Sequence, residues 1–186
     1  MSRARRLEDG VVVVTGAAGG IGSATVRRAV AEGARVVATD LDPEALGRSL
    51  EDVLAGPDAE HCLAVRQDVT DPARWDAVFD LAAEHFGPAT GLVNNAGIAR
   101  PESIEDASLE AWRATLAVNL DSVHLGCRAA VAAMKAHGGS IVNVSSIMGL
   151  VGGAGPAYNA SKGGVRLLTK SVAAWAATNG LPIRVN

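Results

Sequence analysis

Hydrophobic and polar positions along the chain form short apolar runs that alternate with longer alanine-rich stretches of mixed polarity. Runs of about five residues rich in valine and isoleucine are typical of strands, whereas apolar residues at every third or fourth position are typical of amphipathic helices. The pattern predicts strands at 11–15, 35–40, 62–67, 92–95, 140–145 and 183–186, and helices near 21–32, 43–55, 72–86, 108–136 and 158–179.

Two of these helices have a clear start signal, a proline that directly follows an aspartate. Asp42 precedes Pro43, and Asp71 precedes Pro72. Aspartate is favoured as an N-cap and proline at the first helical position, so both helices are expected to begin at the proline.

The order of the elements indicates an α/β fold class, because strands and helices alternate along the whole chain. Strands as apolar as the run Val11–Val14 are usually buried on both faces, as in a parallel sheet covered by helices on each side. Right-handed crossovers then give a doubly wound parallel sheet in three αβα layers. We therefore expect a single domain over residues 1–186, with a ligand crevice at the carboxyl ends of the strands.

Charge and hydropathy narrow the classes of partner. The chain has 17 Lys and Arg against 20 Asp and Glu, a formal charge of −3, whereas a nucleic-acid-binding protein is expected to have a basic face. The basic N-terminal segment "MSRARRLEDG" lacks the apolar stretch of a signal peptide, and no run of about 18 apolar residues occurs. We expect a cytoplasmic protein without a nucleic-acid or membrane partner.

The cysteines and histidines give no sign of a metal site or a disulfide. Cys62 and Cys127 lie far apart in sequence and form no C-x-x-C motif, and the four histidines lack the spacing of metal ligands. Both cysteines are interpreted as reduced, buried thiols, and no metal is expected.

A glycine-rich loop, "TGAAGGIG" at residues 15–22, connects the first strand to the first helix. Without Cβ atoms, the backbone N–H groups of such a loop can approach a pyrophosphate, and the helix N-terminus adds positive potential. This position predicts a dinucleotide-binding loop whose contacts come from Gly16, Gly20, Ile21 and Gly22.

Acidic residues follow the second and third strands. Asp40 lies 18 residues after Gly22, where a carboxylate accepts hydrogen bonds from a ribose 2′-hydroxyl and repels a 2′-phosphate, so NAD is expected in preference to NADP. A capping or turn role is the alternative for Asp40. At the same edge, an adenine would rest against Val69 while Asp68 accepts a hydrogen bond, although a simple turn role fits Asp68 equally well.

The stretch "AYNASKGG" contains the only tyrosine of the chain, Tyr158, and places Lys162 four residues later on the same helix face. A free phenol has a pKa of about 10, so a base active near neutrality needs a pKa about three units lower, or about 4 kcal/mol. A positive charge at about 4 Å supplies about 4 kcal/mol at an effective dielectric near 20. Tyr158 is therefore predicted to transfer a proton, with Lys162 tuning it.

Serine and asparagine complete the candidate site. The fifth strand ends with "NVSS", which brings Ser145 and Ser146 to the same edge as Tyr158, where a serine can anchor the substrate oxygen. Asn119 lies inside the predicted helix 108–136, although asparagine is unfavourable there, so a functional role competes with a solvent-facing or helix-bending one.

From residue 8 onward the chain resembles the short-chain dehydrogenase/reductase family in the order and spacing of five motifs. They are "TGAAGGIG", "NNAG" at 94–97, "VNL" around Asn119, "IVNVSS" and "YNASK". The resemblance implies a Rossmann-type fold and reversible hydride transfer between NAD(P) and an alcohol or carbonyl compound. It also implies a homotetramer formed through helices 108–136 and 158–179.

The resemblance further implies residue roles. Tyr158 would be the general acid/base, and Lys162 would lower the pKa of Tyr158 and hold the nicotinamide ribose. Asn119 would hold a water that links Lys162 to solvent, and Asn95 would touch the cofactor. The family usually uses the second serine of such a pair, here Ser146, but the interval of 12 residues to Tyr158 is one shorter than usual, and Ser145 gives 13.

The chain ends with "LPIRVN", partway through what the family pattern would make its sixth strand. We therefore expect the last strand or strands and the substrate lid to be missing. The main hypothesis is an NAD-dependent dehydrogenase acting on a small-molecule secondary alcohol. The alternatives are a nucleotide-binding fragment without turnover and an NADPH-dependent 3-oxoacyl reductase.

Overall fold

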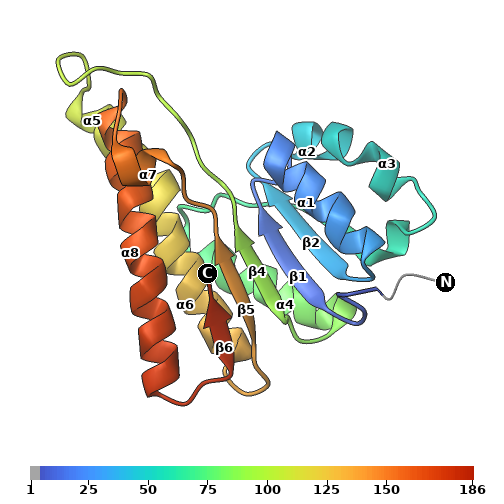
Figure 1. Ribbon diagram of the computed structural model, residues 1–186. Coiled ribbons are helices and arrows are strands. Elements are labelled where there is room, and N and C mark those ends of the chain that lie inside the picture. Colours follow the sequence, from blue (N-terminus) through green and yellow to red (C-terminus); the bar gives the residue numbers. More distant parts are fainter. Residues whose placement is uncertain (1–4) are drawn as a thin grey trace.

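The computed structural model describes residues 5–186, in which six parallel strands form one sheet with helices on both faces (Figure 1). The strand order is β3-β2-β1-β4-β5-β6, with β3 and β6 at the two edges. The bounds are β1 (Val11–Thr15), β2 (Arg35–Asp40), β3 (Cys62–Arg66), β4 (Gly91–Asn94), β5 (Gly139–Asn143) and β6 (Ile183–Val185). This order confirms the predicted doubly wound, Rossmann-type sheet.

The helices divide between the two faces of the sheet. One face is covered by α1 (Gly20–Ala31), α2 (Pro43–Ser49) and α3 (Glu51–Leu54), and the other by α4 (Pro72–Phe86), α6 (Ser122–Met134) and α8 (Pro156–Thr178). The α5 helix (Leu109–Leu116) runs into α6, and the short α7 helix (Met148–Val151) packs on α8. A 3₁₀ turn, Ala59–His61, precedes β3. These layers confirm the three-layer αβα arrangement.

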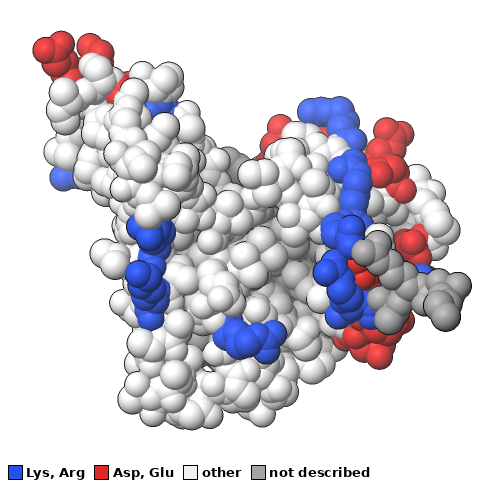
Figure 2. Space-filling view, viewed as in Figure 1, with Lys and Arg blue, Asp and Glu red and all other residues white. Residues whose placement is uncertain are grey.

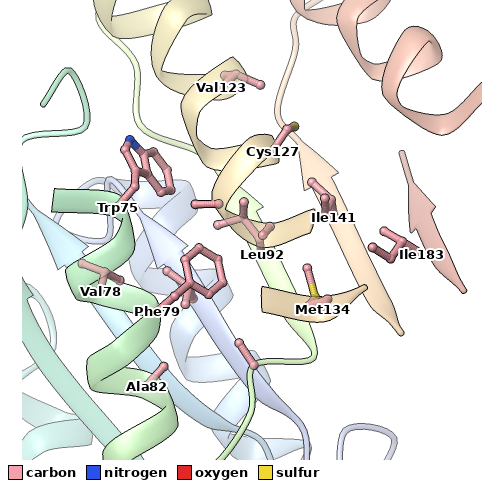
Figure 3. Close-up of a cluster of buried hydrophobic side chains, with 14 of the residues drawn as sticks. Trp75, Val78, Phe79, Ala82, Leu92, Val123, Cys127, Met134, Ile141 and Ile183 are labelled. Carbon is pink, nitrogen blue, oxygen red and sulfur yellow. The ribbon is translucent and has the colours of Figure 1, made fainter. Parts of the chain in front are cut away.

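The larger core fills the space between the sheet and the α4, α6 and α8 layer (Figure 3). Trp75 and Phe79 of α4 face Leu92 of β4, while Met134 of α6 packs toward Ile141 of β5. The smaller core lies under α1 to α3 on the opposite face. Both predicted thiols are buried and free: Cys62 lies in the smaller core and Cys127 in the larger one.

The predicted aspartate caps are present. Asp42 accepts hydrogen bonds from the backbone N–H groups of Glu44 and Ala45, and Asp71 accepts one from Ala73. The helix predicted at 43–55 is divided at Leu50, whose φ of −116° and ψ of 17° are not helical. Leu50 is fully buried in the smaller core, so packing of its side chain breaks the helical path there.

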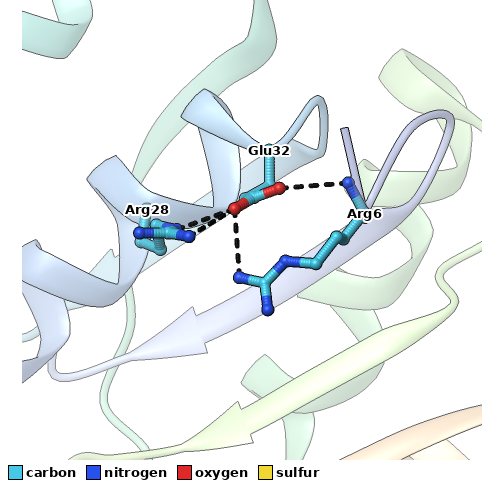
Figure 4. A network of polar contacts seen from close by, with 3 residues as sticks. All are labelled: Arg6, Arg28 and Glu32. Carbon is cyan, nitrogen blue, oxygen red and sulfur yellow. Dashed lines mark hydrogen bonds and ion pairs between the residues drawn. The ribbon is translucent and has the colours of Figure 1, made fainter. Parts of the chain in front are cut away.

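An ion-pair cluster fastens the N-terminal segment to the end of α1 (Figure 4). Glu32, whose side chain is 9% exposed, accepts hydrogen bonds from the backbone N–H and the guanidinium of Arg6, and from the guanidinium of Arg28. Hydrogen bonds from Arg6, followed by that from Arg28, lower the pKa of Glu32 to about 2.

Buried amides connect the central strands to α8. The Nδ2 of Asn94 donates to Oδ1 of Asn143 at 2.8 Å, and the Nδ2 of Asn143 donates to Oγ1 of Thr169 at 2.9 Å. Asn94 and Asn143 are direct partners in the pairing of β4 with β5. The polar contacts therefore fix the two strands relative to each other and to α8.

Charged side chains gather mainly over the α1–α3 end and near the top of α5, and the face over β4 to β6 carries few of them (Figure 2). The surface is hollowed between these two ends, above the carboxyl ends of the strands (Figure 2). Among the helices of residues 5–186, none combines the length and the apolar character needed to cross a membrane.

Candidate active site at the carboxyl edge of the sheet

The glycine loop joins β1 to α1 by a tight backbone turn. Gly16 has a φ of +65°, and a Cβ there would lie 2.7 Å from the Cα of Ala96. A Cβ on Gly22 would lie 2.8 Å from the Cα of Ala17. Both positions therefore require glycine, because a side chain would push the loop away from the neighbouring backbone.

The N-terminus of α1 presents unpaired amides at this loop. The N-cap Gly19 has no side chain to accept hydrogen bonds, and within residues 5–186 the backbone N–H groups of Gly20, Ile21 and Gly22 have no acceptor. Gly20 and Ile21 are exposed. Unpaired amides at a positive helix end suit an anionic group such as a pyrophosphate, so the residues present fit the expected dinucleotide.

Asn95 holds the glycine loop in place. Its Nδ2 donates to the carbonyl oxygens of Thr15 and Gly16, at 2.9 and 3.0 Å. The hydroxyl of Thr15 in turn accepts hydrogen bonds from the backbone N–H groups of Asn95 and Ala96. The side chain of Asn95 thus braces the loop after β1 against the loop after β4.

A cavity of about 170 Å³ lies beside the glycine loop. Gly16, Asp40, Asp68 and Val69 all line it, so four residues predicted to contact the dinucleotide surround one space. Sequence reasoning did not single out Gln67, which also lines the cavity and is 1% exposed. The signal for Gln67 was its place at the end of the third apolar run, next to Asp68.

The two aspartates are held by the backbone in different ways. Asp40 accepts a hydrogen bond from the N–H of Ala18 on one oxygen and from that of Asp42 on the other. One oxygen of Asp68 accepts from both the N–H and the hydroxyl of Thr70, and these bonds lower the pKa of Asp68. Asp68 therefore has the turn role that the sequence allowed, and it also lines the cavity.

Asn119 interrupts the long helix that the sequence predicted at 108–136. Residues Ala117–Asp121 form a π-helical turn between α5 and α6, and Asn119 is fully buried within it. Its amide donates to the carbonyl of Ile98 and accepts from the N–H of Ile98, both at 2.8 Å. The solvent-facing interpretation of Asn119 is therefore wrong, whereas its functional and helix-bending interpretations stay predictions. π-Turns of this kind are frequent at functional sites.

Tyr158 and Lys162 lie in the first two turns of α8, with the Lys162 Nζ 5.9 Å from the centroid of the Tyr158 ring. Lys162 is 4% exposed, and its Nζ donates to the carbonyl of Val144 at 2.9 Å. Burial lowers the pKa of Lys162, because desolvation disfavours its charged form. Tyr158 is partly exposed, so its ring borders both the ammonium and solvent.

The two serines after β5 have different environments. Ser145 donates its hydroxyl hydrogen to the backbone carbonyl of Lys162 at 2.8 Å. The Ser146 oxygen accepts from the N–H of Met148 at 3.1 Å, and its hydroxyl has no acceptor within residues 5–186. Ser146 thus keeps a donor for an incoming oxygen atom, whereas the hydroxyl of Ser145 is occupied in fixing α8.

Sequence reasoning missed α7, which follows Ser146 in a glycine-rich segment. A Cβ on Gly149 would lie 2.6 Å from the backbone carbonyl atoms of Lys162, so α7 and α8 touch backbone to backbone. The only sequence signal was the glycine itself. This contact places the helix that follows Ser146 against the turn of α8 that carries Lys162.

Gly97 joins the two halves of the site. It lines the cavity beside the glycine loop, and a Cβ there would lie 3.3 Å from Oδ1 of Asn119 and 3.5 Å from the Nζ of Lys162. The space expected to hold a dinucleotide and the cluster around Lys162 are therefore separated by one residue without a side chain.

A model of the family described as short chain dehydrogenase matches residues 10–186. An NADP-dependent (R)-specific alcohol dehydrogenase of Lentilactobacillus kefiri is 44% identical over 184 residues, covering 97% of this chain and 72% of that protein. A 3-alpha-(or 20-beta)-hydroxysteroid dehydrogenase of Mycobacterium tuberculosis H37Rv is 47% identical over 184 residues, covering 97% and 68%. The crystal structure of a short chain dehydrogenase from Mycobacterium smegmatis is similar, with a TM-score of 0.88, 37% identity, and coverage of 97% of this chain and 75% of that one.

Proposed function

The chain belongs to the short-chain dehydrogenase family of oxidoreductases, and from this premise we propose that it transfers a hydride between NAD and a secondary alcohol or the corresponding ketone. The proposal rests above all on Gly97, which borders both the cavity beside the glycine loop and the buried Lys162. Proton-transfer groups and dinucleotide-binding groups thereby share one edge of the sheet.

Binding of the dinucleotide is assigned to the glycine loop and the cavity. The unpaired amides of Gly20, Ile21 and Gly22 would bind the pyrophosphate. Asp40 would accept hydrogen bonds from the adenosine ribose, and Val69 would pack against the adenine. Lys162 would also hold the nicotinamide ribose. When bound, the nicotinamide supplies the acceptor or the donor of the hydride.

Proton transfer is assigned to Tyr158. In the direction of oxidation, its phenolate takes the proton of the alcohol O–H, while the hydride leaves the carbon of the same alcohol. The ammonium of Lys162 stabilises the phenolate, and Ser146 donates its free O–H to the substrate oxygen. Asn119 shapes the adjoining turn and would hold a water beside Lys162.

We propose that NAD is preferred over NADP, although one of the similar dehydrogenases is named NADP-dependent. Asp40 supports the preference, because its carboxylate lies on the cavity wall and no lysine or arginine of residues 5–186 lines that cavity. Asp40→Ala should narrow the preference for NAD, and Asp76→Ala, at an exposed position of α4, should leave it unchanged. Equal use of both dinucleotides by the unmutated protein would contradict this assignment.

We also propose that the chain forms a homo-oligomer through α5, α6 and α8. An apolar groove of about 390 Å³ lies between α6 and α8, and Trp175 and Leu167 are 51% and 67% exposed. Trp175→Glu should lower the mass measured by light scattering, whereas Ile104→Glu, at an exposed loop residue, should not. An unchanged mass in Trp175→Glu would contradict the proposal.

The decisive experiment combines binding and turnover. Thermal unfolding is followed with NAD, with NADP and without either, because a ligand that binds the native state raises its stability. Oxidation of a panel of secondary alcohols is then compared with Tyr158→Phe, which should lose the rate. Binding without a Tyr158-dependent rate would favour the nucleotide-binding fragment. A preference for NADPH with oxoacyl substrates would favour the reductase. Absence of any dinucleotide binding would overturn the dehydrogenase, the nucleotide-binding fragment and the reductase alike.

A further inference from the structure

Ser161, which directly precedes Lys162 and was given no role of its own above, is fully buried and has two short polar contacts. Its oxygen accepts a hydrogen bond from the Nδ2 of Asn119 at 3.1 Å, and its hydroxyl donates to the carbonyl of Tyr158 at 2.7 Å. We propose that Ser161 is a positioning residue that couples Asn119 to Tyr158. This inference builds on the function proposed above.

The contacts form a continuous chain from the cavity wall to the tyrosine. Ile98, which lines the cavity, exchanges two backbone hydrogen bonds with the amide of Asn119. The remaining N–H of that amide points to Ser161. Since Asn119 and Ser161 are both 0% exposed, no solvent replaces a lost partner, and the Ser161 hydroxyl keeps a single orientation toward the Tyr158 carbonyl.

Several side-chain hydrogen bonds hold the first turns of α8, among them one from Asn159 to the carbonyl of Gly153, and those of Ser161 differ from the contacts made by the segment after β5. Ser145 binds the carbonyl of Lys162, and Val144 binds its Nζ, so both of these contacts come from the segment after β5. Ser161 instead reaches the wall of the dinucleotide cavity, through Asn119 and Ile98. It therefore links the backbone of Tyr158 to the cavity wall by hydrogen bonds.

Loss of this contact should act on the chemical step rather than on dinucleotide binding. Ser161→Ala leaves one N–H of Asn119 without an acceptor and frees the Tyr158 carbonyl from the hydroxyl. Small displacements of a reacting group reduce rates strongly, by up to about 100-fold for a 1 Å misplacement. We expect kcat to fall about 10-fold in Ser161→Ala while KM for the dinucleotide changes less than about twofold.

The test compares four variants with the unmutated protein. Ser161→Ala removes the hydroxyl, Ser161→Cys keeps the size but donates weakly, and Ser161→Thr keeps the hydroxyl and should restore most of the rate. Thr178→Val is the matched control, because Thr178 lies on the same helix and donates to the Ala174 carbonyl at 2.9 Å, but is exposed and remote from the site.

A second readout does not depend on turnover. Tyr158 is the only tyrosine of the chain, so the ¹⁹F resonance of protein labelled with fluorotyrosine reports the surroundings of its ring alone. This resonance should shift in Ser161→Ala and Ser161→Cys and stay unchanged in Thr178→Val. If the folded Ala and Cys variants keep both kcat and the resonance of the unmutated protein, the coupling does not exist. If the protein shows no turnover at all, the proposed function fails while the comparison of resonances still decides the role of Ser161.

Discussion

Replacing Lys162 by methionine tests the electrostatic basis of the proposed chemistry, because methionine keeps an unbranched apolar stem and removes the charge. The Nζ of Lys162 lies 5.9 Å from the centroid of the Tyr158 ring. If the phenolate charge is placed at the ring centroid, a positive charge at that separation stabilises it by about 2.8 kcal/mol at an effective dielectric of about 20. If this stabilisation is present in the transition state, Lys162→Met should lower kcat about 100-fold.

The assay must separate this effect from unfolding and from weakened binding. Lys162→Met also deprives the partly buried carbonyl of Val144 of its donor, which costs stability of up to about 1–3 kcal/mol. The rate is therefore measured at saturating dinucleotide, below the unfolding temperature of each variant. Lys170→Met, an exposed lysine on the same helix, is the matched control.

Two results would refute the electrostatic reasoning. The first is a loss of less than about threefold in kcat for Lys162→Met at saturating dinucleotide. The second is an equal loss in Lys170→Met. Either result would mean that the ammonium beside Tyr158 does not stabilise the developing phenolate.

Three further outcomes are expected. Since burial lowers the pKa of Lys162 below 10.5, a pH–rate profile should begin its alkaline fall below pH 10.5, and a fall only above that value would contradict the assignment. Since Arg6 and Arg28 lower the pKa of Glu32 from 4.5 to about 2, the stability that Glu32 contributes is present above pH 4.5 and lost as pH falls toward 2. Unfolding curves should therefore show Glu32→Gln to be less stable at neutral pH, with the difference shrinking in acid; a constant difference would count against this. Gly22→Ala should abolish the rise in unfolding temperature given by NAD. Gly47→Ala, in an open helical position, should raise the free energy of unfolding by about 0.5–1 kcal/mol. An unchanged effect of NAD on Gly22→Ala would contradict the close approach of the glycine loop to the dinucleotide.

The order of strands and helices could be predicted from the sequence because each apolar run is short and is bounded by a residue with a local role. Asp42 and Asp71 are examples, since a cap depends only on neighbours within one helical turn. The division of the predicted helix 43–55 could not be predicted in the same way. Leu50 is helix-compatible by propensity, and its packing in the smaller core, an effect of tertiary structure, breaks the helix.

The candidate site also has a part that depends on local sequence and a part that depends on long-range contacts. The four-residue spacing of Tyr158 and Lys162 is local, so the sequence alone places both on one face of α8. The π-turn at Asn119 depends on the backbone of Ile98, 21 residues earlier, and the different environments of Ser145 and Ser146 depend on the approach of α7 to α8. Such long-range contacts leave no periodic pattern in the chain.

The amides of Asn94 and Asn143 have a consequence for how the chain folds. Strands β4 (GLVN) and β5 (GSIVN) each contain only two large apolar residues, so packing alone discriminates poorly between alignments shifted by two residues. A shifted alignment would bury both amides without each other as partners, and so would be disfavoured. These paired side chains therefore act as an alignment check during assembly, one that favours the arrangement in which the loops carrying Asn95 and Ser146 leave neighbouring strands just after the paired amides.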